Sequence, residues 1–462
     1  MKLTHTLAIA AFTDLISAAP PTIAPRQTSG AATVDLSTRT GQARFLGSNF
    51  IYGFPDNGVD AQTSIPDHFL TDIKFNACRA GGAQTTSGGW GSGGYDEYVG
   101  RFESTLSNYR STRKYNGAFI LLLHDLWGAD GGSSVDDLVP GDNGDYTEFD
   151  TFLDQVKKDV EENDMLDGLV IDIWNEPELD LFWKRTWDQY LDYYVHATQL
   201  VRDRFPTTLI TGPSFAHAAS VDIENWQTWA RIVADTQSIP DIYSWHQIGP
   251  WEREPDRTVA DFHTLLTTYN LPDRPIDLNE YASTEEQNPG TSVFYLAQLE
   301  RHDLRGLRAN WGGGGELHDF LANLVYRDGD GVYHPNGEWY VYRYYGEMVG
   351  ERVATTAAAD LLFDVFATLE EGGVKILAGT RSVQAAYDVT VGGLAALGLP
   401  ADGVIGVRTM RFDWSGQFAD AGEPVDVGCV EYTAQAGELV LTVDPPTNST
   451  AFAFEISLDG KC

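Results

Sequence analysis

Short, continuously apolar runs alternate with amphipathic segments between residues 44 and 345. The segments 148–162 and 190–204 carry apolar residues three and four positions apart, which is the helical spacing. The apolar runs are predicted strands, and they cover 45–52, 73–79, 118–124, 169–174, 208–211, 242–246, 276–279 and 307–311. Continuous rather than alternating apolar character is typical of strands that are buried on both faces. Eight such strands with helices between them predict an α/β fold, a (β/α)8 TIM barrel over 44–345.

The pattern changes after about residue 350, where helical periodicity fades. Short runs rich in Val, Thr and Leu follow, separated by Gly, Asp and Pro, at 362–368, 374–377, 385–391, 403–410, 439–443 and 451–456. Runs of this kind predict a C-terminal β-sandwich domain over 346–462. Residues 33–36 are a candidate strand of the same domain.

The N-terminus has the features of a secretory signal peptide. A lysine precedes a short apolar run at 7–12, and small residues follow at 17–19, although Asp14 interrupts the pattern. The run is too short to span a bilayer. We therefore expect a signal peptide over 1–19, with 20–43 serving as a linker or pro-segment.

Two further features, a candidate disulfide and a glycosylation sequon, agree with secretion. Cys429 and Cys462 both lie in the C-terminal region and are candidates for a disulfide, while Cys78 lies in an apolar run and is expected to be a buried thiol. Asn448 begins an Asn-Ser-Thr sequon for N-glycosylation. We therefore expect a secreted, extracellular glycoprotein.

Composition narrows the classes of partner. The 462 residues are 42% hydrophobic and 12% aromatic, which is enough for a large folded core. The net charge of −36 disfavours binding to nucleic acid or to an anionic membrane. The spacing of Cys and His residues matches no metal site, so we expect neither a metal nor a cofactor. The oligomeric state is left open.

Two glutamates follow predicted barrel strands. The fourth strand runs into Asn175-Glu176-Pro177, and the seventh ends in Asn279-Glu280-Tyr281. In a barrel of this type, the carboxyl ends of all strands meet at one face. Either motif alone is also typical of an ordinary turn or surface loop. Together they predict two carboxyl groups that face one another, which is the requirement for hydrolysis of a glycosidic bond.

The surroundings suggest a different role for each glutamate. Apolar and aromatic neighbours, with Glu280 nearby, are expected to raise the pKa of Glu176 and keep it protonated as the acid. Glu280 is then the nucleophile, and Arg79 at the end of the second strand is the expected cation beside it. A rim salt bridge is the alternative interpretation of Arg79.

These motifs resemble those of clan A glycoside hydrolases. Trp174-Asn175-Glu176-Pro177 is similar to the acid/base motif of that clan, and Glu280 is similar to its nucleophile. Further positions match the pattern of the clan, one after each of strands two, three, six and eight: Arg79, His124, His246 and Trp311. A barrel followed by a β-sandwich is most similar to glycoside hydrolase family 39. The resemblance implies a retaining β-glycoside hydrolase that acts on oligo- or polysaccharides with no cofactor.

One position departs from the clan pattern. Many members carry a tyrosine two residues after the histidine of strand six, where it donates to the nucleophile, but here that residue is Ile248. We expect either another group, such as Tyr243 or Tyr281, to supply the contact, or the nucleophile to be tuned differently.

Several residues are predicted to bind the sugar. Asn175 is expected to bind a hydroxyl group, and Trp311 is expected to be an aromatic platform beneath a sugar ring. The other predicted substrate-binding residues are Arg79, His124, His246, Trp127 and Tyr281, and Trp90, Trp245 and Trp251 are further tryptophans near predicted strand ends. Burial in the core is the alternative interpretation of the histidines and tryptophans.

Two other functions remain as alternatives. An endo-acting glycanase of another clan A family would use the same chemistry in an open cleft. A non-catalytic carbohydrate-binding barrel would keep the scaffold without turnover. The presence of both glutamates argues against it, and the absent tyrosine after strand six agrees with it.

Overall fold

The computed structural model describes residues 28–56, 64–131, 134–249 and 254–462. The predicted signal peptide, residues 20–27 of the predicted linker and Trp251 lie outside these ranges. Among the helices in the described ranges, none is long and apolar enough to cross a membrane.

Eight parallel strands close into a barrel, as the apolar runs predict. In chain order they are β2 (Asn49–Ile51), β3 (Ala77–Ala80), β4 (Ala118–Leu122), β5 (Leu169–Asp172), β6 (Leu209–Phe215), β7 (Ile242–Gln247), β8 (Ile276–Tyr281) and β9 (Arg305–Arg308). Each strand pairs with the next in parallel register, and β9 closes the ring against β2. The predicted TIM barrel is confirmed.

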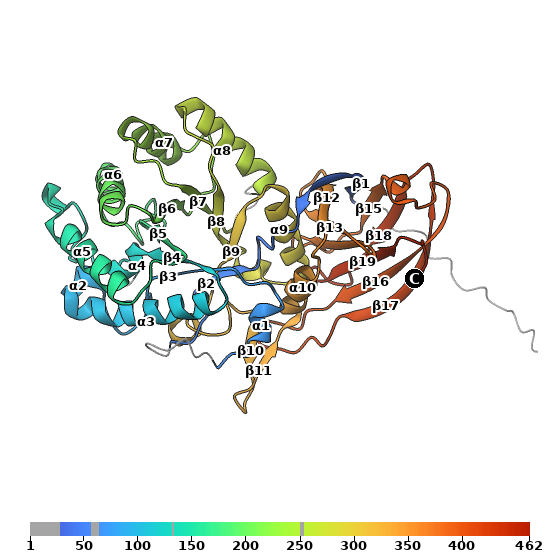
Figure 1. Ribbon diagram of the computed structural model, residues 1–462, viewed down its shortest axis with the longest axis horizontal. Helices are drawn as coiled ribbons and strands as arrows, with labels where there is room; N and C mark the ends of the chain where they lie inside the picture. Colours follow the sequence, from blue (N-terminus) through green and yellow to red (C-terminus); the bar gives the residue numbers. More distant parts are fainter. Residues whose placement is uncertain (1–27, 57–63, 132–133, 250–253) are drawn as a thin grey trace, which may run out of the picture.

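Helices cover the outside of the barrel (Figure 1). They are α1 (His68–Thr71), α2 (Trp90–Gly93), α3 (Tyr95–Lys114), α4 (Leu123–Trp127), α5 (Thr147–Glu162), α6 (Trp187–Arg204), α7 (Glu224–Thr236), α8 (Pro255–Tyr269), α9 (Pro289–Arg301) and α10 (Gly337–Gly346). Both helices predicted from periodicity, α5 and α6, are present. In α5 the buried residues are Phe149, Phe152, Leu153, Val156 and Val160, so one face packs on the barrel and the other meets solvent. The Thr186 hydroxyl caps the start of α6 by accepting the Gln189 N–H.

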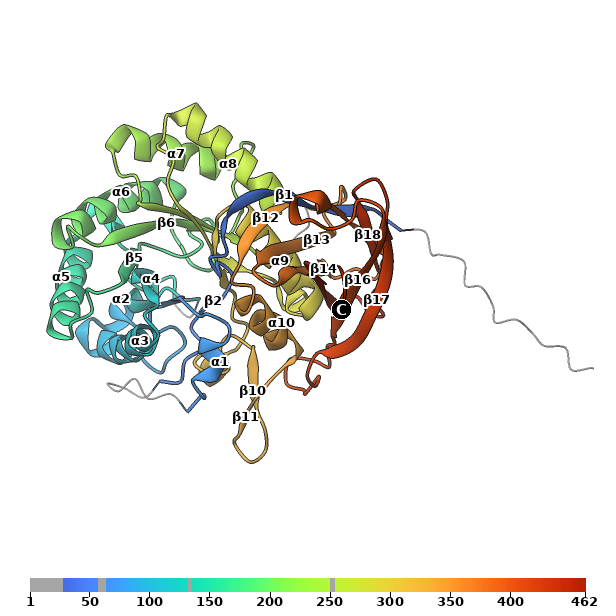
Figure 2. The same ribbon diagram turned by 45° about the vertical axis from the view of Figure 1, so that its right-hand side comes forward.

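The C-terminal domain is rich in β-structure, as predicted. Its nine-stranded sheet has the order β17-β16-β19-β14-β13-β12-β1-β15-β18. The strands are β1 (Ala31–Gln42), β12 (Glu351–Thr356), β13 (Phe363–Glu370), β14 (Gly373–Thr380), β15 (Tyr387–Gly392), β16 (Gly403–Phe412), β17 (Val425–Ala434), β18 (Leu439–Val443) and β19 (Ala451–Ser457). A separate hairpin, β10 (Val325–Arg327) with β11 (Tyr333–Pro335), projects from the barrel side (Figure 2).

The N-terminal strand belongs to this C-terminal sheet, in agreement with the candidate strand at 33–36 but over a longer range. β1 pairs with β12 on one side and with β15 on the other, and in Figure 1 its blue ribbon lies among the orange and red strands. The sheet curls so that its edge strands β17 and β18 come into contact. One apolar cluster, including Val34, Val365 and Leu441, fills the space enclosed by the curl. The two halves of the sheet thus face each other across one core, as in a β-sandwich.

The barrel and the sheet share a continuous apolar contact. Phe366, Leu377 and Ala453 lie on the outer face of the sheet and belong to the same core cluster as the barrel. Helix α9 packs between them, against β13 and β14. At its end, Arg301 binds the buried carboxylate of Asp364.

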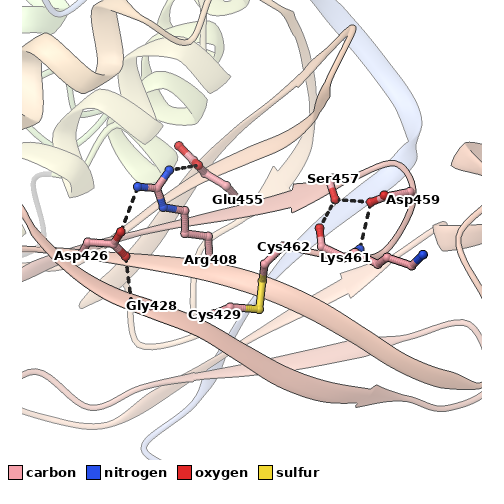
Figure 3. The surroundings of a disulfide bond; sticks show 9 residues. All are labelled: Arg408, Asp426, Gly428, Cys429, Glu455, Ser457, Asp459, Lys461 and Cys462. Atoms are coloured by element: carbon pink, nitrogen blue, oxygen red, sulfur yellow. Dashed lines mark hydrogen bonds and ion pairs between the residues drawn. A yellow bond between two sulfur atoms is a disulfide. The ribbon is translucent and has the colours of Figure 1, made fainter.

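A disulfide joins Cys429 on β17 to the C-terminal residue Cys462 (Figure 3). The two Cα atoms are 5.9 Å apart. The pairing that the sequence left as a candidate is therefore present. Cys78 is a buried free thiol, as expected.

Loss of this disulfide should destabilise the β-rich domain. The loop it closes spans 33 residues, for which the chain-entropy model gives about 3–4 kcal/mol of stabilisation. We expect the Cys429→Ser, Cys462→Ser double variant to unfold at a lower temperature in a calorimetric scan. A reducing agent should lower the unfolding temperature of the wild type and leave the double variant unchanged. Equal unfolding temperatures for both proteins would contradict the assignment.

Candidate active site

The two predicted glutamates meet at one end of the barrel. Glu176 lies on the loop that follows β5, and Glu280 lies within β8 near its carboxyl end. Their side chains are 14% and 15% exposed, and both line one cavity of about 340 Å³. A cavity of this volume lies in the range of small-molecule sites.

The loop that carries Glu176 is held in an unusual backbone conformation. Glu176 has a φ of +43°, in the left-handed region that side chains other than glycine rarely adopt. Its N–H donates to the carbonyl of Ser214 on β6 at 3.0 Å. Strain of this kind persists only where surrounding contacts enforce it, and it is concentrated at functional sites.

A single imidazole contacts both glutamates. His246 on β7 is fully buried, and its Nδ1 lies 2.7 Å from Oε1 of Glu176. Its Nε2 lies 3.6 Å from Oε1 of Glu280. The ring is therefore within hydrogen-bond distance of Glu176 and lies close to Glu280.

Arg79 forms an ion pair with Glu280. The guanidinium is buried at the end of β3, and Nη1 donates to Oε1 of Glu280 at 2.8 Å. Nη2 donates to Oδ1 of Asn175 at 2.8 Å, and Nε donates to Asp172 at 2.9 Å. Each nitrogen of the guanidinium is thus engaged by a different partner, which fixes its plane.

Burial and charge act in opposite directions on the two charged partners. Burial raises the pKa of Glu280 above its usual value of 4.5, and the nearby Glu176 adds to the increase, while His246 and Arg79 oppose it. For Arg79, burial lowers the pKa, but the charges of Asp172 and Glu280 outweigh this and raise the pKa overall. Arg79 therefore stays charged beside a carboxyl group that ionises less readily than usual.

A second polar group follows β4, which lies between the strands that lead to Arg79 and Glu176. His124 begins the short helix α4 directly after β4, and its Nδ1 lies 2.6 Å from Oδ1 of Asp125. The Tyr52 hydroxyl donates to the other oxygen of Asp125. Burial opposes ionisation of Asp125, but the contacts with His124 and Tyr52 hold its pKa below the usual value. Asp125 is therefore an anion that faces the cavity.

The outer wall of the cavity is aromatic. Trp311 is 42% exposed, and its indole N–H donates to the carbonyl of Ala282 at 3.1 Å, which fixes the ring at the rim. The side chains that line the cavity include Tyr52, Arg79, Gln84, His124, Asp125, Asp130, Asn175, Glu176, Phe182, Glu280, Asn310 and Trp311. Six of the nine predicted site residues line this cavity: Arg79, His124, Asn175, Glu176, Glu280 and Trp311. A seventh, His246, does not line it but contacts Glu176.

Two predicted substrate-binding residues are not brought to the cavity. Trp127 is 2% exposed, packs against Phe149 and Phe152, and donates to the carbonyl of Leu138. Tyr281 is fully buried, and its hydroxyl donates to the carbonyl of Gly47. The structure therefore does not bring these two residues to the cavity of the glutamates: Tyr281 lies in the core, and Trp127 borders a smaller neighbouring cavity that also contacts Phe182.

The other tryptophans near predicted strand ends also differ from the prediction. Trp90 packs against Tyr98 and Phe152, and Trp245 is fully buried against Trp226 and Phe262. Neither lines the cavity that contains the glutamates. Both have the core role that was the alternative interpretation.

Neither of the two tyrosines replaces the tyrosine absent after strand six. Tyr243 donates to the carbonyl of Pro272, and Tyr281 donates away from the cavity. Glu280 instead has Arg79 and His246 as its close neighbours. The expectation of a substituting tyrosine is corrected, and the alternative that the nucleophile is tuned differently agrees with the contacts.

Several site residues were not predicted. Asp172 is visible in the sequence as one aspartate within an apolar strand, and this is a usable signal for a buried polar role. Tyr52, Asp125, Phe182 and Asn310 line the cavity, but no local pattern distinguishes them. Within the described ranges, no group of three or more His, Cys, Asp or Glu residues could hold a metal ion.

No family model matches the chain, and no curated protein matches it by sequence. Solved structures do share its fold. A protein from Neocallimastix frontalis is 18% identical with a TM-score of 0.71, and the match covers 94% of this chain and 100% of that chain. A glucosidase from Croceicoccus marinus is 14% identical with a TM-score of 0.59, over 93% and 99% of the two chains.

An enzyme of glycoside hydrolase family 39 from Xanthomonas axonopodis pv. citri is 14% identical with a TM-score of 0.55, over 92% of this chain and 97% of that chain. At these identities the similarity shows the fold alone. That fold, a TIM barrel with a β-rich C-terminal domain, is one found in glycoside hydrolases.

The pKa of Glu280 can be tested without a substrate. In protein carrying carboxyl-¹³C glutamate, we expect the Glu280 NMR signal, assigned by its loss in Glu280→Gln, to titrate above pH 4.5 because burial raises its pKa. Since the pKa is higher in the folded than in the unfolded state, the contribution of Glu280 to stability is full at low pH and is lost as pH rises through the folded-state pKa. Titration at or below 4.5 would contradict the description of the site.

Proposed function

We propose that this protein is a retaining β-glycoside hydrolase that uses Glu280 as nucleophile and Glu176 as acid/base. One observation carries the proposal: two glutamates from opposite parts of the barrel line one cavity and contact the same histidine. Paired carboxyl groups across a sugar-sized cavity are the common requirement of glycosidases. The fold shared with glycoside hydrolases and the resemblance of the Trp174–Pro177 motif support it.

Glu280 is the better nucleophile because a fixed cation holds it. Arg79 binds Oε1 at 2.8 Å and favours the anion that must attack. In the first step a carboxylate oxygen of Glu280 forms a bond to the anomeric carbon while the bond from that carbon to the leaving oxygen breaks. The product is a covalent glycosyl-enzyme.

Glu176 is the better acid/base because its partner can exchange a proton. His246 Nδ1 lies 2.7 Å from its carboxyl group. In the first step Glu176 gives its proton to the leaving oxygen. In the second step it takes a proton from water, the water oxygen bonds to the anomeric carbon, and the bond to Glu280 breaks.

The charge of the cavity favours an uncharged sugar. Asp125, Asp130, Glu176 and Glu280 all line it, and Arg79 is already engaged by three partners. A carboxylate or sulfate on the substrate would meet this negative potential without a compensating cation among the described lining residues. Similar folds include a glucosidase, a beta-xylosidase and a xyloglucanase, so we propose β-glucosides or β-xylosides as substrates.

Trp311 is the proposed platform for the sugar ring. Its indole is part-exposed at the cavity rim and anchored through its N–H, so its face is available for stacking. Asn175 is the proposed partner of a sugar hydroxyl, because its Oδ1 is held by Arg79 and its amide group reaches the cavity.

We also propose that the protein is exported. The Cys429–Cys462 disulfide is typical of oxidising compartments, and it supports the prediction made from the N-terminal sequence.

Replacing either glutamate should abolish most activity. We expect Glu280→Gln and Glu176→Gln each to lower kcat/KM on the best aryl β-glycoside by about 10²–10⁴-fold or more, because each removes a group that acts only in the transition state. Hydrolysis is measured by release of the aryl group across a panel of β-glucosides, β-xylosides and β-glucuronides. Unfolding temperatures check that the fold is intact.

Glu178→Gln is the matched control, since Glu178 lies two residues from Glu176 but binds His217 outside the cavity. It should hydrolyse the substrate at nearly the wild-type rate. Near-normal turnover by either Glu176→Gln or Glu280→Gln would refute the assignment. Glycan binding without any turnover by the wild type would favour a non-catalytic barrel.

A further inference from the structure

Asp172 is a buried carboxylate that the proposed reaction does not use. It ends β5 within the apolar run Val170-Ile171-Asp172-Ile173 and is fully buried. A carboxylate that is taken out of water costs several kcal/mol unless partners satisfy it. Its retention in the middle of the barrel therefore calls for a function.

Three strands supply hydrogen-bond donors to Asp172. Arg79 on β3 donates Nε–H to Oδ2 at 2.9 Å, and Asn279 on β8 donates to the same oxygen at 3.2 Å. The Ser214 hydroxyl on β6 lies 2.9 Å from Oδ1 and 2.8 Å from Oδ2. Ser214 in turn contacts the Ser244 hydroxyl on β7 at 2.9 Å. Asp172 is thus the centre of a polar layer directly beneath the two glutamates.

The backbone is distorted to complete this layer. Ser214 has a φ of +58°, and the register between β6 and β7 shifts between Pro213 and Phe215. A bulge of this kind re-aims a side chain, here toward Asp172. The carbonyl of Ser214 also accepts the N–H of Glu176. The same residue therefore connects Asp172 to the loop of the acid/base.

The guanidinium of Arg79 forms ion pairs with two carboxyl groups, those of Asp172 and Glu280. Arg79 contacts Asp172 through Nε and Glu280 through Nη1, so its charge is divided between them. Because the guanidinium is planar, the bond to Asp172 also sets the direction in which Nη1 points. A change at Asp172 must therefore reach Glu280 through Arg79.

We propose that Asp172 is a positioning residue that orients Arg79 toward Glu280 and withholds part of its charge from Glu280. Asp172 touches no atom of the cavity, and its effect on catalysis is indirect. The part of the proposal that concerns reaction rate rests on Glu280 being the nucleophile, but the coupling between the two carboxyl groups does not.

The groups that face this pair come from five parts of the barrel. They are Arg79, His124, Asp125, Glu176 and His246, together with Tyr190, Tyr193 and Tyr194 of α6, which lie near Asp172. Burial raises the pKa of each of the three tyrosines far above the range of the carboxyl groups, so they remain neutral. Burial also raises the pKa of Asp172, while Arg79 and Ser214 lower it.

Asp172→Asn is the decisive variant because it removes the charge and keeps the shape. The amide oxygen can still accept from Arg79 and Asn279, and the amide N–H₂ can donate to Ser214. With no competing anion, the whole charge of Arg79 acts on Glu280. We expect the ¹³C signal of Glu280 to titrate about one pH unit lower than in the wild type.

Ser214→Ala is the second variant. It removes one donor from Asp172, so Asp172 ionises less readily and competes less for Arg79. The Glu280 signal should move in the same direction by a smaller amount. Asp364→Asn is the matched control, because Asp364 is equally buried and bound by Arg301 but lies on β13. It should leave the Glu280 titration unchanged.

An unchanged Glu280 titration in folded Asp172→Asn, or a shift to higher pH, would overturn the proposal. So would a shift of the same size in Asp364→Asn, because that would indicate a general effect of removing a buried charge. If Asp172→Asn fails to fold, the Ser214→Ala titration decides in the same way.

Activity then separates this proposal from the proposed function. Where the wild type hydrolyses a glycoside and Glu280→Gln does not, Asp172→Asn should move the acid limb of kcat/KM to lower pH by about one unit. An acid limb that stays in place would overturn the role of Asp172 while leaving Glu280 as nucleophile. Absence of hydrolysis by the wild type would count against the proposed function, and the NMR titration would still test the coupling.

Discussion

The buried guanidinium of Arg79 is the interaction on which the rest of the site depends. It lies at the end of β3 and reaches β5 through Asp172, the loop after β5 through Asn175, and β8 through Glu280. A charge in this position is stable only with partners, because transfer from water costs several kcal/mol. The barrel supplies these partners from strands that are far apart in sequence, and closure of the ring brings them together.

This constraint explains why the centre of the barrel is polar just below its mouth. Around the strands the core is filled by apolar side chains such as Phe50, Ile120 and Ile171. The layer that contains Asp172, Ser214 and Asn279 instead satisfies Arg79, and above it His246 joins Glu176 to Glu280. The left-handed backbone at Glu176 and Ser214 is the structural consequence, since both residues turn away from regular strand geometry to make these contacts. Polar groups and strain are thus concentrated where chemistry is proposed.

The sequence predicted the barrel well because its signal is physical and local. Strands buried on both faces must be continuously apolar, and all eight runs of this kind form the barrel. Strands β12 and β17 were missed for the same reason. Most residues of β17 are exposed and Gly428 interrupts it, so Val425–Ala434 lacks the continuous apolar character of a strand that is buried on both faces.

Site prediction succeeded for the groups that the strand ends bring to one face of the barrel, and it failed for Tyr281 and Trp127, whose rings are buried. Glu280 and Arg79 lie on strands, and their positions followed from the barrel rule. Trp127 and Trp311 both follow strand ends, yet one is buried against α5 and the other is exposed at the rim. The difference arises because α4 begins immediately after β4, and within it Trp127 packs against Phe149 and Phe152 of α5. Ser214 gave no signal at all, because its inward direction depends on a bulge between two paired strands.

The most direct test of the account is to trap the covalent intermediate. A 2-deoxy-2-fluoro glycoside with a good leaving group slows both steps, since fluorine destabilises the positive charge that develops at the anomeric carbon, and the leaving group lets the first step proceed. The account predicts that peptide mass spectrometry finds one fluorosugar attached to Glu280, with 2-fluoroglucosides and 2-fluoroxylosides as the first reagents. Labelling of a different residue, or hydrolysis of the ordinary glycoside to a product of inverted configuration, would contradict it.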